Sequence, residues 1–139
     1  MAFAGISYLA VVVAAIASYV FGSVWYMALS KPWLAALGRT EAEIRGGGGP
    51  SPVPFVVAAL AQVVMAYVLA GLIGHLGPGN VTPKNGMISA LFVWAGFIAT
   101  SLATNHAFQQ SKRMLTLIDG GHWLGVLLIQ GLVIGLFGT

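Results

Sequence analysis

Side chains that could bind an ion or move a proton are concentrated in one short stretch of this sequence. The stretch holds Asn105, Gln109, Asp119 and His122. A carboxylate and an imidazole held close together can bind a cation or relay protons, which is one hypothesis for this cluster. The alternative is structural, since an Asp in the first turn of a helix complements the positive end of the helix dipole and accepts bonds from free backbone N–H groups. In both accounts Asp119 needs a hydrogen-bonding partner.

The rest of the chain is too apolar for a water-soluble domain. Of 139 residues, 58% are hydrophobic and 6% are charged, and the mean hydropathy is +0.91. In soluble domains, about a quarter of all residues are charged. The six basic residues are scattered among predicted loops and form no basic stripe, so we expect no nucleic-acid partner. The chain has no cysteine, which rules out disulfides and thiolate metal sites.

Four segments are apolar over the roughly 20 residues that a helix needs to cross the hydrocarbon core. None of them contains Lys or Arg, and they cover residues 3–29, 53–76, 86–108 and 115–137. The connections between the last three are short. The sequence therefore predicts an all-α integral membrane protein, a bundle of four transmembrane helices that forms a single domain over residues 1–139.

The longest connection, residues 30–52, is predicted to hold an interfacial segment followed by a linker. Between Lys31 and Arg45, Trp33, Leu34 and Leu37 would share one side of a short helix, with most charges on the other, as in helices that lie at a membrane surface. The following GGGGPSPVP predicts a flexible linker, because no strand precedes it and no Gly-Lys-Ser/Thr follows it as in a phosphate-binding loop.

The distribution of basic residues predicts the direction of the chain through the membrane. The second loop has Lys84 alone, whereas the first and third loops have Lys31, Arg39, Arg45, Lys112 and Arg113. By the positive-inside rule, the first and third loops face the cytoplasm. We therefore expect both termini to be extracytoplasmic, in the periplasm if the membrane is a bacterial inner membrane.

Small residues spaced four apart line one face of every predicted span. Such faces let helix backbones approach closely in lipid. The first span has Ala14, Ser18 and Gly22, the third has Gly96, Thr100 and Thr104, and the fourth has Gly121, Gly125, Gly131 and Gly135. Contacts within one bundle would account for these faces. Two Gly-x-x-x-Gly pairs in one helix exceed what a four-helix bundle requires, however, and favour a homo-oligomer.

The hairpin of the last two spans should bring the polar residues to one level. Asn105 lies seven residues before Lys112 and Asp119 lies seven after it, so each sits roughly 10 Å along its helix from the turn. Asn105 and Gln109 share a helix face, as do Asp119 and His122. Tyr26 reaches a similar depth from the first span. The predicted polar cluster, or ligand site, therefore consists of five residues: Tyr26, Asn105, Gln109, Asp119 and His122.

No set of residues supports a catalytic or metal centre. His106, His122 and the single carboxylate of the spans match no metal-ligand spacing, and His106 should point away from the face of Asn105. No nucleophile–base pair or pair of carboxylates can be assembled. We therefore expect neither enzyme activity nor a cofactor.

Two hypotheses for function remain. The first is a small polytopic membrane protein that works as a homo-oligomeric helical assembly. The second is a small channel or transporter subunit for a cation, proton or small molecule. In that case Gln62, Thr100, Thr104, Asn105, Asp119 and Gln130 would line a polar path.

Three motifs resemble the family of small bacterial membrane proteins catalogued as domain of unknown function 1761. They are "FGSVWYMALSKPW" at the end of the first span, "NHAFQQSK" at the end of the third, and "LIDGGHWLGVLLIQGLVIGLFG" for the last helix. The resemblance covers essentially the whole chain. It implies a four-span membrane protein and no established activity.

Overall fold

The fold is a bundle of apolar helices, seen in a computed structural model that describes residues 5–45 and 51–138. Four helices are long and apolar enough to cross a membrane, which confirms the predicted all-α integral membrane protein. In chain order the elements are α1 (Tyr8–Ala28), α2 (Ser30–Leu37), α3 (Glu41–Arg45), α4 (Val53–Gly74), α5 (Pro83–Val93), the π-helical η2 (Trp94–Ala99), α6 (Thr100–Phe108) and α7 (Arg113–Phe137).

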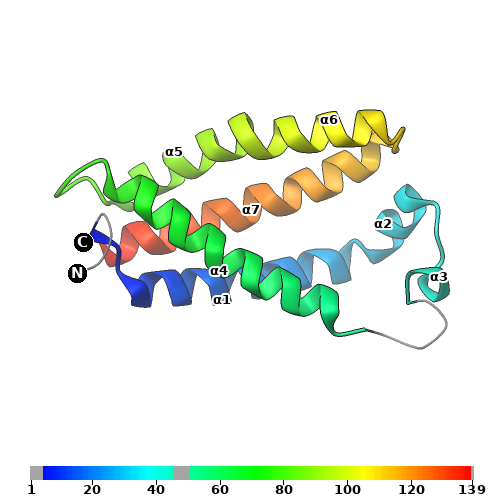
Figure 1. Ribbon diagram of the computed structural model, residues 1–139, viewed down its shortest axis with the longest axis horizontal. Coiled ribbons are helices and arrows are strands. Elements are labelled where there is room, and N and C mark those ends of the chain that lie inside the picture. Colours follow the sequence, from blue (N-terminus) through cyan, green and yellow to red (C-terminus); the bar gives the residue numbers. More distant parts are fainter. Residues whose placement is uncertain (1–4, 46–50, 139) are drawn as a thin grey trace.

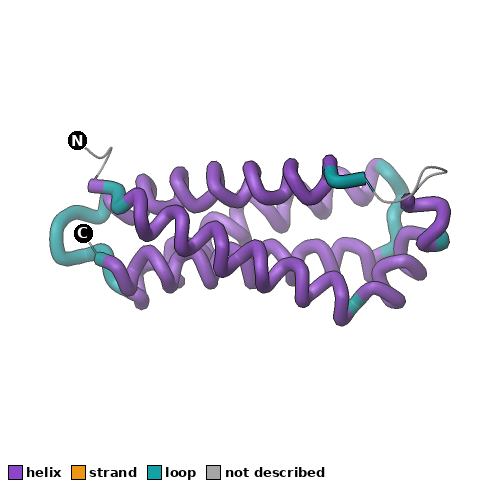
Figure 2. Tube along the Cα trace, turned by 90° about the horizontal axis from the view of Figure 1, so that it is seen from below, coloured by secondary structure: helices purple, strands orange, loops and turns teal. Residues whose placement is uncertain are grey.

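Helix α7 occupies the middle of the bundle. It packs most extensively on α5 and α1, and α4 lies across α1 (Figure 1). The long helices run side by side along the molecule, as the view from below also shows (Figure 2). One end, called the α2 end below, holds α2, α3 and the turn between α6 and α7. The chain ends and the α4–α5 turn lie at the opposite end (Figure 1).

Local sequence signals explain where several elements begin and end. The Ser7 side chain accepts a bond from Ala10 N at 3.2 Å and starts α1, and Thr82 caps α5 in the same way, as expected for hydroxyl N-caps. Helix α2 ends at Gly38, whose φ of +70° favours glycine. This break divides the expected interfacial helix into α2 and α3. The whole glycine run of the predicted linker falls within residues 46–50, which lie outside the described residues.

The third membrane helix is continuous from Pro83 to Phe108 but contains the unpredicted π-helical segment η2. A π-helical turn bonds residue i to i+5 and is wider than an α-helical turn. The wider turn changes which of the following residues lie on the buried face of the helix. Trp94, Ile98 and His106 are all partly buried, in contrast to the exposed Phe97 and Thr100.

The glycines of α7 are used for packing inside the chain. A Cβ on Gly131 would meet the Gly86 carbonyl of α5, and a Cβ on Gly135 would meet the Thr82 carbonyl. Gly121 and Gly125 similarly lie against α1, where a Cβ would meet the Trp25 and Phe21 rings respectively. The expectation that these four glycines provide surplus surface for a second copy is therefore wrong. Ala14, Ser18 and Gly22 are likewise buried within the bundle.

Candidate functional site

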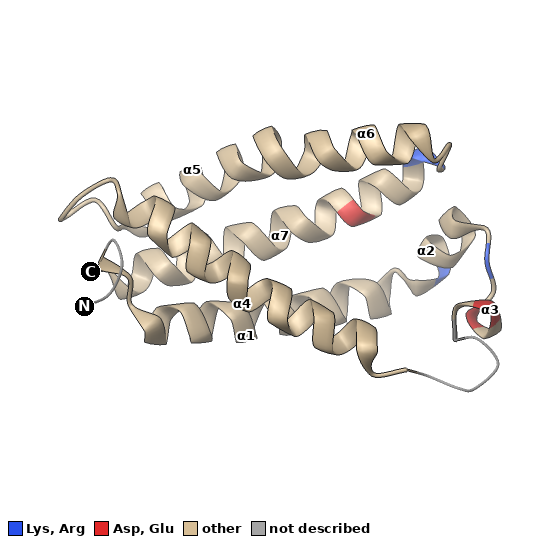
Figure 3. Cartoon of the chain, viewed as in Figure 1, with Lys and Arg blue, Asp and Glu red and all other residues tan. Residues whose placement is uncertain are grey.

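Asp119 lies on α7 within a cluster of polar side chains near the α2 end. Asp119 belongs to α7 (Arg113–Phe137), the helix on which Figure 3 shows a red, acidic segment. The Tyr26 hydroxyl of α1 donates to Asp119 Oδ1 at 2.7 Å. On the far side of the Tyr26 ring, Trp33 of α2 makes an edge contact at a centroid distance of 5.8 Å. The structure therefore gives Asp119 the partner that a carboxylate in a low-dielectric layer requires, and this partner, Tyr26, is a member of the predicted polar cluster.

The second oxygen of the carboxylate faces α6. His106 Nε2 lies 3.9 Å from Asp119 Oδ2, and the other ring nitrogen of His106 lies 2.8 Å from Thr116 Oγ1. Both side chains are mostly covered, with 11% of His106 and 21% of Asp119 exposed. Tyr26, His106, Thr116 and Asp119, here called the carboxylate cluster, thus join α1, α6 and α7.

Two tryptophans hold α7 at the level of the carboxylate cluster. Trp25 Nε1 of α1 donates to the Ile118 carbonyl at 3.0 Å, and Trp94 Nε1 of η2 donates to the Gly120 carbonyl at 2.9 Å. The two carbonyls flank Asp119 in sequence. Two indoles from opposite neighbours therefore fix the turn of α7 that presents the carboxylate, and no spacing in the sequence pointed to Trp94.

His122 lies one turn beyond Asp119 on α7 and forms no hydrogen bond to it in the described part of the chain. Its ring is 5% exposed and contacts Tyr26 and Trp123, with centroid distances of 4.8 and 4.5 Å. Nε2 lies against Gly22, where a Cβ would be 2.6 Å away. Nδ1 is buried with no hydrogen-bond partner among the described residues. His122 therefore belongs to a layer of aromatic rings beside the carboxylate cluster, here called the aromatic layer. It contacts the ring of Tyr26, and the Tyr26 hydroxyl in turn bonds Asp119.

The remaining two residues of the predicted cluster lie elsewhere. Asn105 and Gln109 are exposed, and the neighbouring His106 faces Asp119 instead. The predicted depth along the third helix is nearly right, because His106, which lies beside Asp119, is the residue next to Asn105. The predicted rotation of the third helix is wrong: the face of Asn105 was expected to look toward Asp119, but His106, which points away from that face as expected, lies beside Asp119 instead. The π-helical turn, which shifts the helix phase, is one physical reason.

A second polar cluster lies deeper in the bundle and is fully buried. Ser18 Oγ donates to Gln62 Oε1 at 2.7 Å, and Gln130 Nε2 donates to Ser18 Oγ at 3.1 Å and to the Gln62 carbonyl at 3.2 Å. None of the three residues is more than 2% exposed. They connect α1, α4 and α7, so this glutamine cluster is an interhelical hydrogen-bond network in a region with no water to compete.

The residues named for a polar path do not share one surface. Gln62 and Gln130 face the bundle centre, whereas Thr100 and Thr104 are exposed on the outside of the third helix. Both threonine hydroxyls donate at 2.9 Å to the carbonyl four residues earlier. Such bonds satisfy hydroxyls within their own helix. Nothing in this arrangement favours the channel hypothesis.

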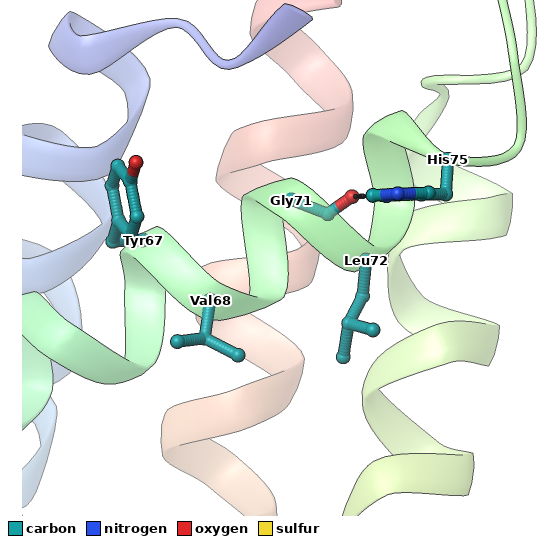
Figure 4. A pocket seen from close by; sticks show the side chains of 5 residues that line it. All are labelled: Tyr67, Val68, Gly71, Leu72 and His75. Carbon is teal, nitrogen blue, oxygen red and sulfur yellow. Dashed lines mark hydrogen bonds between the residues drawn. The ribbon is translucent and has the colours of Figure 1, made fainter. Parts of the chain in front are cut away.

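A shallow apolar groove of about 240 Å³ lies on α4, away from both polar clusters. It is lined by Tyr67, Val68, Gly71, Leu72 and His75, and the His75 ring bonds the Gly71 carbonyl across it (Figure 4). All five residues come from the last turns of α4, at the end of the bundle opposite α2. The groove has little polar lining and is open to the surroundings of the bundle, as a lipid-facing surface would be.

The described residues include no group of three or more His, Cys, Asp or Glu side chains that could hold a metal ion. Within the carboxylate cluster, His106 and Asp119 are the two residues of these types. The side chains of the cluster can form hydrogen bonds, pair charges and gain or lose a proton.

Residues 9–135 match the model of a family described as a protein of unknown function, DUF1761. The chain belongs to this family. No curated protein and no solved structure matches the chain. Membership agrees with the four apolar helices and the integral membrane architecture, and it adds no activity.

Proposed function

We propose that this member of the DUF1761 family works without enzymatic activity, as a homo-oligomeric assembly of four-span subunits. The subunits would meet through the outer surface of the third membrane helix. The observation that carries the proposal is a row of small exposed residues on that surface. This small-residue face consists of Gly96, Thr100, Ala103, Thr104 and Ala107.

The small-residue face differs from the exposed surfaces of the other helices. Exposed positions on α1 and α4 are mostly large, as with Leu9, Ile16, Val56 and Leu60. On the third helix, no large hydrophobic residue between Phe97 and Phe108 is exposed. A Cβ added at Gly96 would find nothing within 4 Å, so its surface is open. In lipid, small residues favour association because they let a second helix approach the backbone.

The third helix is also the least covered of the four spans. Within the most apolar window of Pro83–Phe108, 11% of residues are buried, compared with 33% to 44% in the other three. Asn105 is exposed beside the small-residue face, and an amide in or near a bilayer favours an interhelical hydrogen bond. A second copy of the chain would cover this helix and offer partners for Asn105.

The absence of cysteine from the native chain allows a direct test by disulfide cross-linking. Thr104→Cys should cross-link two copies in the membrane under mild oxidation. Ser23→Cys is the matched control, since Ser23 is a small exposed residue on α1 that the proposal leaves facing lipid. Adding Gly96→Leu to Thr104→Cys should abolish the cross-link. A protein that remains monomeric in mild detergent, or equal cross-linking at Ser23, would reject the assembly.

We further propose that both termini are extracytoplasmic in a bacterial inner membrane. The proposal is supported by the gathering of Lys and Arg at the α2 end (Figure 3), opposite the ends of the chain. Cytoplasmic loops carry such an excess of basic residues. C-terminal fusions to a reporter active only in the periplasm should be active. Activity of a cytoplasm-only reporter at the same position would reverse the orientation.

A further inference from the structure

The side chains that meet between α6 and α7 have the composition of a proton site. Asp119 Oδ2 and His106 Nε2 face each other at 3.9 Å, close enough for charge pairing and beyond the length of a direct hydrogen bond. We propose that His106 and Asp119 bind one exchangeable proton between them and so fasten α6 to α7. The ligand is the proton itself, and the site is distinct from the small-residue face proposed for assembly.

Thr116 lets His106 gain or lose a proton without losing a hydrogen bond. Its hydroxyl lies 2.8 Å from His106 Nδ1, and a hydroxyl can either donate or accept. When the imidazole is neutral, Thr116 donates to Nδ1 and the Nε2–H points to Asp119. When the imidazole is protonated, the Nδ1–H donates to Thr116 and the heavy atoms stay in place. The same geometry therefore serves both protonation states.

The charge of Asp119 has no other cation to balance it among the described residues. The group within 4.0 Å that can become positive is His106. From α1, Tyr26 donates a neutral hydrogen bond, and His122 on α7 contacts the ring of Tyr26. Lys112 is directed to the Ala35 carbonyl of α2 at 3.2 Å. A carboxylate in a low-dielectric layer is costly without a counter-charge, and His106 supplies that counter-charge when it holds the proton.

The side chains of His106 and Asp119 are mostly covered but remain partly open to the surroundings of the bundle. The side-chain exposures of 11% for His106 and 21% for Asp119 leave an edge open for a proton to enter. Tyr26 covers part of Asp119 through its hydrogen bond, and its ring is itself in contact with the rings of Trp33 and His122. The pair therefore communicates with the surface near the α2 end rather than with the bundle centre, where the glutamine cluster lies.

The small number of acidic residues makes the site measurable. The chain has three, of which Glu41 and Glu43 lie in α3. In a Glu41→Gln/Glu43→Gln background, Asp119 is the one side-chain carboxyl left, so infrared difference spectra recorded during a pH titration in vesicles report it directly. The ring nitrogens of the three histidines are followed in parallel by ¹⁵N NMR.

Asp119 and His106 should change protonation at linked midpoints. His106→Gln should move the Asp119 midpoint by at least about one pH unit, which is tenfold in proton affinity. His75→Gln, on α4 at the opposite end, is the matched control and should leave it unchanged. Asp119→Asn should move the His106 signal but not that of His75. Circular dichroism establishes that each variant remains folded.

An Asp119 midpoint that is the same with and without His106, in folded protein, would overturn the proposal. So would a carboxyl group that shows no titration over the range in which the bundle remains folded. Neither measurement depends on oligomeric state, so the proton site and the proposed assembly can fail separately.

Discussion

The Tyr26 hydroxyl donates to Asp119 Oδ1 over 2.7 Å, joining residues 93 positions apart. This bond connects the end of α1 to the first third of α7. The two tryptophans that bond the Ile118 and Gly120 carbonyls hold α7 from both sides at the same level. A single turn of the central helix is therefore held by hydrogen bonds from α1 and η2, with His106 of α6 beside it.

Tyr26→Phe should lower the free energy of unfolding by about 1 to 3 kcal/mol, because the carboxylate loses a hydrogen-bond donor that water cannot easily replace. Chemical denaturation in mild detergent measures the change. Tyr8→Phe is the control, since Tyr8 is 55% exposed and should change stability little. An equal loss for both variants would contradict a stabilising role for the bond to Asp119.

The four-span fold could be predicted because the bilayer imposes a simple requirement on sequence. A run of about 20 apolar residues without Lys or Arg is enough to predict a spanning helix, and α4 ends within two residues of the predicted span. The break at Gly38 was missed, because glycine lowers helix propensity without forbidding a helix. The left-handed conformation that ends α2 depends on how the following residues leave the helix.

The sequence could predict how far along the helices the site lies, but not which face of the third helix points toward it. Counting residues from the turn put Asp119 level with Asn105, and helical rise alone determines that level. Which side of the third helix faces α7 depends on its phase, and η2 changes that phase over one turn. His106 could have been found by considering both faces at the predicted level. The residues of the third helix carry no local signal for a π-helical turn.

Spacing alone also could not say which partner the glycines of α7 meet. A Gly-x-x-x-Gly pair predicts close approach of a helix, whether that helix belongs to the same chain or to another copy. The structure places α5 against Gly131 and Gly135, and α1 against Gly121 and Gly125. The open small-residue face is instead on the third helix, and Gly96 is the glycine within it.

Gly131→Ala should destabilise the subunit by about 1 to 3 kcal/mol, as overpacking does. The added Cβ would overlap the Gly86 backbone, which cannot move aside as a flexible side chain could. Gly120→Ala is the matched control on the same helix, where a new Cβ would find nothing within 4 Å. It should be neutral or stabilise by up to about 1 kcal/mol through helix propensity. Comparable losses in thermal stability for both variants would contradict the packing described for α7.

Ser18→Ala should lower the free energy of unfolding by about 1 to 2 kcal/mol, since interhelical hydrogen bonds in membranes are modest. The change removes the donor to Gln62 and the acceptor for Gln130. Ser23→Ala removes an exposed hydroxyl that bonds only the Tyr19 carbonyl of its own helix, and should have little effect. If Ser18→Ala unfolds no more easily than Ser23→Ala in detergent, the glutamine cluster does not stabilise the bundle.

Gly22 and His122 should be energetically coupled, because the imidazole occupies the space where a side chain at Gly22 would lie. A Cβ there would be 2.6 Å from Nε2 and 3.3 Å from Cδ2 of His122. Gly22→Ala should therefore cost about 1 to 3 kcal/mol of stability in the native chain. In a His122→Ala background the clash is gone, and the same change should cost little. The four unfolding free energies form a double-mutant cycle whose coupling should be about 1 kcal/mol or more. Effects that add to within about 0.5 kcal/mol would show that the ring moves away from Gly22 at no cost, and that the aromatic layer is not rigidly packed.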